Sequence, residues 1–214
     1  MHHTIALFNL TLVAVWTLLL LPLQLVVLAL RLPLAALVPR VYHRGKCLIL
    51  GIKIELVGQK APTGAVLFPE GTSSDGNRVL PFKSSFFAVA EAPVRGRPLA
   101  VQPVSLACTR LDNIQMGRRL RPMFAWYGDM SLLPHLWRIF GAGSVTAVVE
   151  FHPVVTIDLF ISRKTLAAHC HAEVAAGLSR ALAGRLRPSG IPAEEPGTGP
   201  GKLDTWGANA SVSE

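Results

Sequence analysis

Charged side chains are missing from one long stretch of this chain. Residues 4–30 contain no Asp, Glu, Lys or Arg, and residues 5–30 are predominantly Leu, Val, Ala and other apolar types. A helix rises about 1.5 Å per residue, so a helix of this length would span the roughly 30 Å hydrocarbon core of a bilayer. This composition is atypical of a soluble domain, and it predicts a membrane segment.

The features of a cleaved signal peptide are also largely missing. Such a peptide has a basic start and a shorter apolar core, whereas only two histidines precede this run. Pro22 lies in the middle of the run and Pro33 near its end, and proline kinks or ends a helix. The sequence fits either a kinked membrane span or a helical hairpin in one leaflet, and it does not choose between them.

Acidic residues are scarce, with 13 Asp and Glu against 21 Lys and Arg, a formal net charge of +8. Arg31, Arg40, Arg44 and Lys46 follow the apolar run and no Lys or Arg precedes it, so the positive-inside rule predicts a body on the cytoplasmic face. The charge suits an anionic membrane surface, with membrane lipids as partners. Zinc-finger spacing, an aromatic RNA-binding strand and a long basic helix are all missing, so no nucleic-acid partner is predicted.

Cysteines are few. Cys47, Cys108 and Cys170 are odd in number and far apart, which excludes a disulfide framework and the paired cysteines of a zinc site. His169 and His171 are two residues apart in a helical pattern and would point to different faces, so they do not form a metal pair. No metal site is predicted, and the cysteines are expected to be reduced.

The body alternates strand and helix patterns. Period-two or short apolar runs predict strands at residues 52–57, 65–68, 99–106, 123–127 and 145–151. Residues 81–92 favour a short helix, and residues 162–184 form a helical pattern with Ser162 as its N-cap. This order predicts an α/β fold, a mixed sheet with flanking helices, preceded by an N-terminal membrane helix or helical hairpin.

Composition divides the chain into three parts. Residues 1–44 form the predicted membrane-associated segment, and residues 45–186 form the α/β domain. Residues 187–214 are rich in Pro, Gly, Ser and Glu and are expected to be a disordered tail, because they bury too little apolar surface to offset the entropy of ordering.

One motif carries a family resemblance. The sequence Phe-Pro-Glu-Gly-Thr at residues 68–72 resembles the acceptor-binding block of the glycerolipid acyltransferases, a family that includes 1-acylglycerol-3-phosphate O-acyltransferases and lyso-ornithine lipid O-acyltransferases. Val-Gln-Pro-Val-Ser at residues 101–105 is similar to the proline-bearing strand that follows it in that family. The resemblance implies that residues 45–186 are a truncated acyltransferase-like domain. It also implies that the lipid head is bound by Phe68, Pro69, Glu70, Gly71, Thr72 and Ser73, with positive charge from Arg78 or Lys83.

The catalytic half of the family pattern is missing. Members of that family use an upstream His-x-x-x-x-Asp pair as general base, and none of the seven histidines here has an aspartate five residues on. His152 with Asp158 comes nearest, but the spacing is one residue too long. Only residues 58–64 separate two strands between which the family places several dozen residues. The chain therefore resembles a member that lacks an internal segment, and no catalytic residue can be identified.

The sequence does not decide between the acceptor lipids of two branches of the family. Ser73 stands where phosphate-binding members carry an arginine, so either Arg78 or Lys83 supplies that charge or the acceptor has no phosphate. Gly-Thr-Ser-Ser at residues 71–74 is similar to the ornithine-lipid branch.

Two functions follow from the resemblance. The first is an enzyme that transfers an acyl group from acyl-CoA or acyl carrier protein, its co-substrate, to the hydroxyl of lysophosphatidate or lyso-ornithine lipid, with no other cofactor. The second is an inactive membrane-bound remnant that keeps affinity for lipid heads. A missing segment also predicts an exposed apolar surface near Leu67 and Phe68 and poor solubility of the body.

Overall fold

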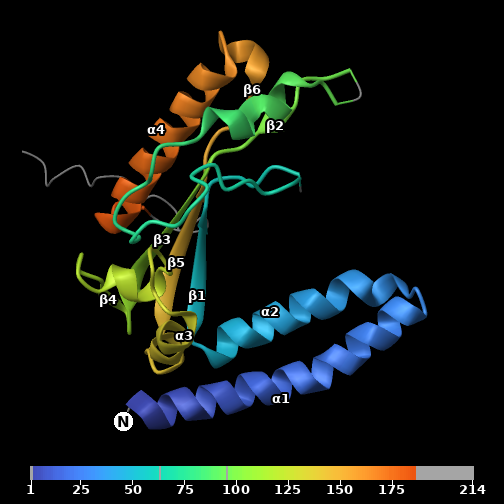
Figure 1. Cartoon of the computed structure of the whole chain (residues 1–214), viewed down its shortest axis with the longest axis vertical. Coiled ribbons are helices and arrows are strands. Elements are labelled where there is room, and N and C mark those ends of the chain that lie inside the picture. Colours follow the sequence, from blue (N-terminus) through green and yellow to red (C-terminus); the bar gives the residue numbers. More distant parts are fainter. Residues whose placement is uncertain (1, 63, 95, 187–214) are drawn as a thin grey trace, which may run out of the picture.

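The computed structural model describes residues 2–62, 64–94 and 96–186, so the tail expected at 187–214 lies outside the described residues (Figure 1). The α-helices are α1 (His2–Ala29), α2 (Leu37–Ile49), α3 (Leu132–Phe140) and α4 (Arg163–Leu182). The strands are β1 (Ile52–Val57), β2 (Ala100–Val101), β3 (Val104–Leu111), β4 (Ile114–Gln115), β5 (Val145–Phe151) and β6 (Val155–Thr156). Short 3-10 helices are η1 (Pro33–Ala36), η2 (Ser84–Glu91), η3 (Arg121–Phe124) and η4 (Ile157–Leu159).

The main sheet has the strand order β1-β5-β3-β4. β1 runs parallel to β5, whereas β3 runs antiparallel to both β5 and β4, and β2 and β6 form a separate antiparallel pair. Asp112 and Asn113 join β3 to β4 and both have positive φ, which the two-residue hairpin turn requires and which Asp and Asn tolerate. The predicted α/β fold with a mixed sheet and flanking helices is confirmed.

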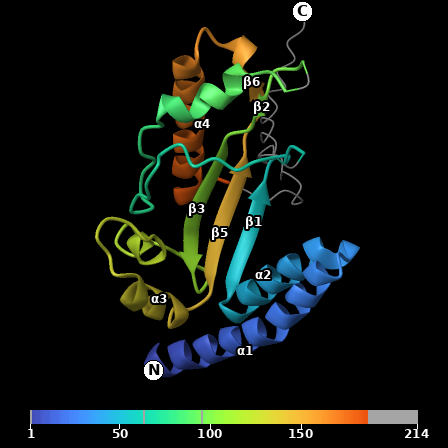
Figure 2. The same ribbon diagram turned by 45° about the vertical axis from the view of Figure 1, so that its right-hand side comes forward.

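α4 covers one face of this sheet (Figure 2). Ser162 caps its start, because the Ser162 side chain accepts from the Thr165 N–H while the Thr165 hydroxyl accepts from the Ser162 N–H. Leu178 and Ala181 pack on Ala107 of β3 and Val148 of β5. A second cluster joins the first half of α4 to η2 and contains Phe87, Ala90, Leu166, Ala167 and Cys170. Both the predicted N-cap and the predicted helix are confirmed.

The opposite face of the sheet is apolar and exposed. Alternation along the strands places Ile54 and Leu56 of β1 and Leu106 of β3 on this face, and they are 55%, 50% and 64% exposed. No helix in the described residues packs over them. We call this surface the open face.

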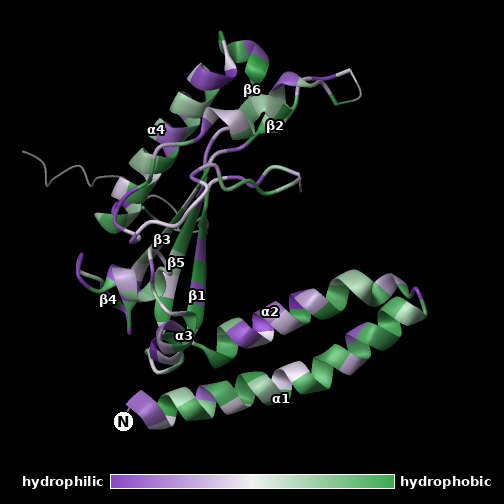
Figure 3. Cartoon of the chain, in the orientation of Figure 1, coloured by the Kyte–Doolittle hydropathy of each residue, from purple (hydrophilic) through white to green (hydrophobic). Residues whose placement is uncertain are grey.

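α1 and α2 form a helical hairpin, with α1 apolar along most of its length (Figure 3). The Trp16 indole lies against Gly45, where a larger residue would overlap the ring, and Trp16 Nε1 donates to Tyr42 O at 3.2 Å. Pro22 lies inside α1 without ending it. The basic residues Arg40, Arg44 and Lys46, for which no helix of their own was predicted, lie in α2.

The first turns of α1 rest against the body. Asn9 Nδ2 donates to Phe140 O at 2.9 Å, and Trp137 Nε1 of α3 donates to His3 Nδ1 at 3.0 Å. Ala6 is fully buried. The start of α1 is therefore attached to the body through α3, whereas its other end turns away from the body into η1 and α2 (Figure 1).

Three strand predictions need correction. Residues 65–68 form no strand and are exposed rather than buried, since no neighbouring strand in the described residues pairs with them. Residues 123–127 end η3 and then run without regular structure, because Pro122 favours a turn and Trp126 Nε1 bonds locally to Met130 O. The single strand expected at 99–106 is divided between two sheets, with the break at Gln102 and Pro103.

Candidate functional site

The residues of the motif form a tight turn. The Gly71 N–H donates to Phe68 O at 3.1 Å, and Gly71 has a φ of 69°, which glycine adopts without the steric cost of a side chain. A side chain at this position would meet Lys83 Nζ at 2.7 Å. The glycine of the motif therefore allows both the turn and the close approach of the Lys83 ammonium group.

The chain returns beside this turn at Lys83. The Lys83 N–H donates to Pro69 O at 2.9 Å, and the Leu80 N–H donates to Glu70 Oε2 at 3.2 Å. These bonds fix the orientation of the Glu70 carboxylate, which is only half-buried and keeps acceptor capacity on its other lone pairs. Residues 68–83 thus present a carboxylate and an ammonium group from one loop.

The far end of this loop is closed by its own side chains. The Asn77 N–H and its Nδ2 donate to the two oxygens of Asp75, each at 3.0 Å, and these bonds, first the one from the Asn77 side chain, lower the pKa of Asp75. Arg121 Nη1 donates to Asn77 Oδ1 at 3.0 Å. Of the two cations expected to serve the site, Lys83 lies at the motif turn, whereas Arg78 lies beside Asp75 at this far end.

Thr72 and Ser73 are exposed in this loop, and Phe68 is 78% exposed. Val66 and Leu67 before them are also exposed. The expectation of an exposed apolar surface near Leu67 and Phe68 is confirmed. An apolar strip therefore leads to the polar turn, an arrangement that suits an amphiphilic ligand.

A histidine with carboxylate partners does occur, but away from the exposed loop. His152 Nδ1 lies 3.6 Å from Glu173 Oε2, its Nε2 lies 3.9 Å from Glu150 Oε2, and Ser105 Oγ lies 2.6 Å from the same Nε2. Arg180 Nη2 donates to Glu150 Oε1 at 2.9 Å. We call these five residues the buried polar cluster; they join β3, β5 and α4.

The histidine and the serine of the buried polar cluster are covered, although Glu173 and Arg180 reach the surface. His152 is 4% exposed and Ser105 is 2% exposed, and α4 lies over both, with Ser105 Oγ also donating to Val174 O at 3.0 Å. Burial lowers the pKa of His152, although the Glu150 and Glu173 carboxylates oppose this and Arg180 adds to it. The cluster orders α4 on the sheet and does not supply a base to the exposed loop.

Spacing along the sequence failed to find this cluster, because its partners come from separate elements. One signal was available: Glu150 and His152 are two residues apart, and Ser105 is the register partner of Glu150. Residues on alternate strand positions share a face, so Glu150 and His152 could have been paired. Glu173 could not, since it depends on how α4 packs.

His171 is the histidine that the contacts bring to the motif loop. Its ring meets the edge of Phe82, next to Lys83, with ring centroids 5.3 Å apart, while His169 packs on Phe160. His171 Nε2 is buried and has no hydrogen-bond partner within the described residues. No carboxylate orients this ring in the described part of the chain, so it does not reproduce a His-carboxylate base.

Comparison with known proteins identifies relatives of one kind. The chain is 45% identical over 126 residues to a lyso-ornithine lipid O-acyltransferase of Brucella abortus, an alignment that covers 58% of this chain and 47% of that protein. It is 37% identical over 142 residues to the protein of the same name in Rhizobium meliloti, covering 64% and 49%, and 37% identical over 116 residues to that of Rhodobacter capsulatus, covering 54% and 40%. The chain is thus homologous, over part of its length, to lyso-ornithine lipid O-acyltransferases.

The homology is partial in a second sense, because the aligned part of the chain spans about half the length of the curated relatives it matches. No family model matches the sequence, and no solved structure matches it. The resemblance to glycerolipid acyltransferases is confirmed. The missing internal segment stays a prediction.

Proposed function

We propose that this chain is a lysolipid O-acyltransferase that holds its acceptor in the loop of residues 68–83. The observation that carries the proposal is the geometry of this loop, in which the Leu80 N–H orients the Glu70 carboxylate while Lys83 Nζ lies against Gly71. The partial homology to acyltransferases of lyso-ornithine lipid supports it. Phe68, Pro69, Thr72 and Ser73 are the further acceptor-binding residues.

The acceptor in this proposal is a lyso-ornithine-type lipid. An ornithine head carries an ammonium and a carboxylate, and the loop offers Glu70 to the first and Lys83 to the second. Arg78, at the far end of the loop, contributes longer-range positive charge. Ser73, where a phosphate-binding relative would have a guanidinium, also favours a head without phosphate.

The reaction needs a base. The acceptor hydroxyl oxygen attacks the thioester carbonyl of acyl-CoA or acyl carrier protein, a C–O bond forms, the C–S bond breaks, and the hydroxyl proton passes by way of the base to the leaving thiolate. No histidine of the chain has the His-x-x-x-x-Asp spacing, and His152 is covered by α4. This observation favours a second candidate function, a membrane-bound remnant that binds lipid heads without transfer.

The hairpin provides the membrane attachment in both cases. α1 is long and apolar enough to cross a bilayer, yet its first turns bond to α3 and its middle turns pair with α2. A helix held to the body at its start and packed on α2 lies along one leaflet more readily than across the bilayer. Arg40 and Arg44 of α2 are exposed, and they suit an anionic surface on the cytoplasmic side.

Acyl transfer by membranes that contain this chain tests the proposal. Labelled acyl-CoA and acyl carrier protein are each offered with lyso-ornithine lipid and with lysophosphatidate. Transfer is expected to lyso-ornithine lipid and to fall about 5- to 150-fold in Glu70→Ala, since an unpaired ammonium in the site costs roughly 1–3 kcal/mol.

Glu91→Ala is the matched control. Glu91 is an exposed carboxylate that pairs with Arg163 at 3.4 Å outside the loop, so its loss is expected to leave transfer unchanged. Equal loss in both variants would show a general effect on folding. No transfer from folded protein, combined with Glu70-dependent binding of lyso-ornithine lipid, would establish the remnant instead.

A further inference from the structure

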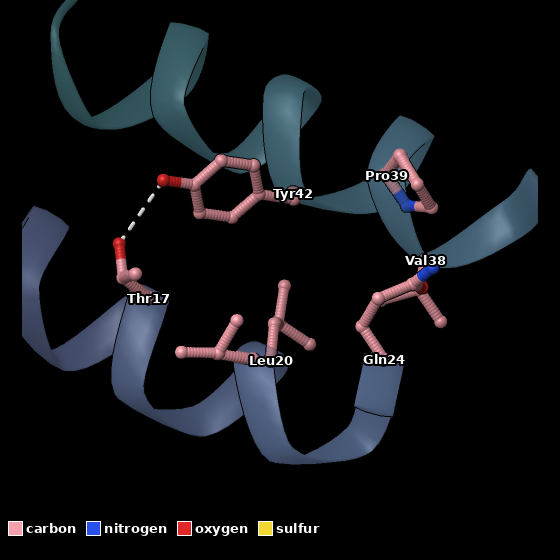
Figure 4. A pocket seen from close by; sticks show the side chains of 7 residues that line it. Thr17, Leu20, Gln24, Val38, Pro39 and Tyr42 are labelled. Atoms are coloured by element: carbon pink, nitrogen blue, oxygen red, sulfur yellow. Dashed lines mark hydrogen bonds between the residues drawn. The ribbon is translucent and has the colours of Figure 1, made fainter. Parts of the chain in front are cut away.

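The two helices of the hairpin enclose a cleft that the acceptor loop does not line. Its volume is about 240 Å³, and its lining is mostly apolar (Figure 4). An apolar cavity of about 150 Å³ is already large enough to take up benzene. The cleft is lined from α1 by Thr17, Leu20, Leu21 and Gln24 and from α2 by Val38, Pro39 and Tyr42.

The oxygen atoms of Thr17, Tyr42 and Gln24 at this cleft have spare acceptor capacity. Thr17 Oγ1 donates its single hydrogen to Val13 O at 2.7 Å, so in its 3.1 Å contact with Tyr42 the tyrosine hydroxyl is the donor. Tyr42 Oη then keeps only lone pairs. Gln24 Nε2 donates one of its two hydrogens to Ala35 O in a long 3.4 Å bond, and no hydrogen-bond partner is present for Gln24 Oε1 within the described residues.

Gln24 Oε1 is buried and has no hydrogen-bond partner within the described residues. A buried acceptor without a donor is costly, and the cost is removed when a ligand supplies the donor. The last side-chain torsion of glutamine is broad, so the amide can turn Oε1 toward the cleft in exchange for the long Nε2 bond to Ala35 O. The complement of Gln24 Oε1 is therefore an N–H or O–H group, and the mostly apolar lining suits an apolar chain attached to that group.

The apolar surface around the cleft gives a lipid of this kind access from the bilayer. The outward residues of α1 are apolar, with Leu18 and Leu19 70% and 64% exposed, so the cleft opens between helices that contact the bilayer in the proposed attachment. Val38 at the cleft is 8% exposed, so the wall on the α2 side is packed. A chain can enter from the leaflet without crossing water.

We propose that the cleft between α1 and α2 binds one acyl chain of an amphiphile that carries an N–H or O–H donor beside the chain, with that donor hydrogen-bonded to Gln24 Oε1. The site is separate from the acceptor loop and does not require acyl transfer. It gives the hairpin a lipid-binding role in addition to attachment.

Photo-crosslinking of the full chain in phosphatidylcholine nanodiscs tests this site, because that lipid has no N–H or O–H donor. The probe is an N-acylethanolamine with a diazirine in its acyl chain, and the matched probe is the methyl ester of the same fatty acid. The amide probe is expected to label residues 17–42 about two- to tenfold more than the ester, as one net hydrogen bond predicts.

Three variants locate the labelling. Gln24→Leu is expected to reduce amide labelling to the level of the ester, and Leu20→Trp to remove both by filling the cleft. Leu19→Trp adds the same side chain on the exposed outer surface and is expected to change nothing. Equal labelling of wild-type protein by both probes overturns the proposal whatever the variants do, as does labelling that survives Leu20→Trp.

Competition with unlabelled lipids identifies which lipid supplies the acyl chain bound in the cleft. Displacement of the probe by unlabelled lyso-ornithine lipid alone assigns the cleft to the acceptor, whereas equal displacement by phosphatidylethanolamine assigns it to bulk lipid. Displacement by neither overturns the proposal. Labelling that persists in Glu70→Ala shows that the cleft is independent of the acceptor loop, so failure of acyl transfer and failure of the cleft are separate results.

Discussion

The two faces of the main sheet differ in what covers them. One face lies under α4, where Ala107 and Val148 contact Leu178 and Ala181 and the buried polar cluster links helix to strands. The open face carries Ile54, Leu56 and Leu106 with no helix of the described residues over it. The same strands thus pack against a helix on one face and expose apolar side chains on the other.

The difference indicates what a second layer contributes. In α/β domains, helices cover both faces of the sheet, and a large exposed apolar patch marks a surface that something covers. The segment expected to be missing between β1 and residues 65–83 would supply such a cover. Stability of this chain therefore depends on the α4 side, and its solubility depends on the open face.

The largest difference between the faces is expected from leucine truncation. Leu178→Ala on the α4 side removes buried contacts and leaves a cavity, and we expect a loss of about 3 kcal/mol in the free energy of unfolding. Leu106→Ala on the open face removes a side chain that is already 64% exposed, and we expect a loss of less than about 0.5 kcal/mol. Urea unfolding of the full chain in mild detergent measures both, and equal losses would contradict the comparison.

A smaller effect is expected from adding one methyl group to α4. A Cβ at Gly177 would lie 2.5 Å from Glu150 Oε2 and 2.7 Å from His152 Cε1 and would also contact Ser105 Oγ. We expect Gly177→Ala to cost about 2 kcal/mol, despite the higher helix propensity of alanine, because the buried polar cluster must shift.

Gly117→Ala is the matched control for this change. Gly117 has no atom within 4 Å of the added Cβ and lies outside the helices and strands. The same urea unfolding experiment is expected to show a change within about 0.5 kcal/mol. A tolerated alanine at Gly177 would mean that α4 does not pack closely on the sheet.

Low pH is expected to reduce the free energy of unfolding through His152, which lies under α4. Burial holds the pKa of His152 below its ordinary value of about 6.5, so as the pH falls through that value the unfolded chain binds a proton that the folded chain does not. Stability is complete above this pH and is lost as the pH falls toward the lowered pKa. Thermal unfolding between pH 7 and 5 measures the slope.

Two histidine variants test whether His152 causes this pH dependence of stability. His152→Gln is expected to remove it, since the titrating group is gone. His43→Gln, which changes an exposed histidine of α2, is expected to leave the slope in place. A slope that persists in His152→Gln would assign the pH dependence to another group.

The helices and strands that could be predicted are those whose residues show a local pattern of apolar positions. The alternation at residues 52–57 and 145–151 gave β1 and β5 with their observed bounds, and the periodicity after Ser162 gave α4. α2 was missed because its basic residues resemble a connector, although Val38 and Tyr42 form a stripe toward α1. Residues 65–68 have strand composition but no partner strand among the described residues, and a strand depends on its partner.

The same distinction holds for the candidate site. The motif Phe-Pro-Glu-Gly-Thr identified Glu70 and Gly71, and its turn lies within a few residues of sequence. The return of Lys83 to Gly71 and the meeting of His152 with Glu173 depend on how distant segments pack. Spacing rules describe one element at a time, so they could not place these pairs.

A charged substitution on the open face is expected to change stability least and to reduce self-association of the protein clearly. Leu106→Lys places a charge on an exposed apolar surface, so the free energy of unfolding is expected to change by less than about 0.5 kcal/mol, while self-association falls because the patch is interrupted. Light scattering at several protein concentrations in one non-ionic detergent measures the association. Ile161→Lys adds the same charge at a residue that is 97% exposed and lies outside the open face, so it should not change association. If Ile161→Lys reduced association as much as Leu106→Lys, net charge would be the cause, and the open face would not be the surface through which copies of this chain meet.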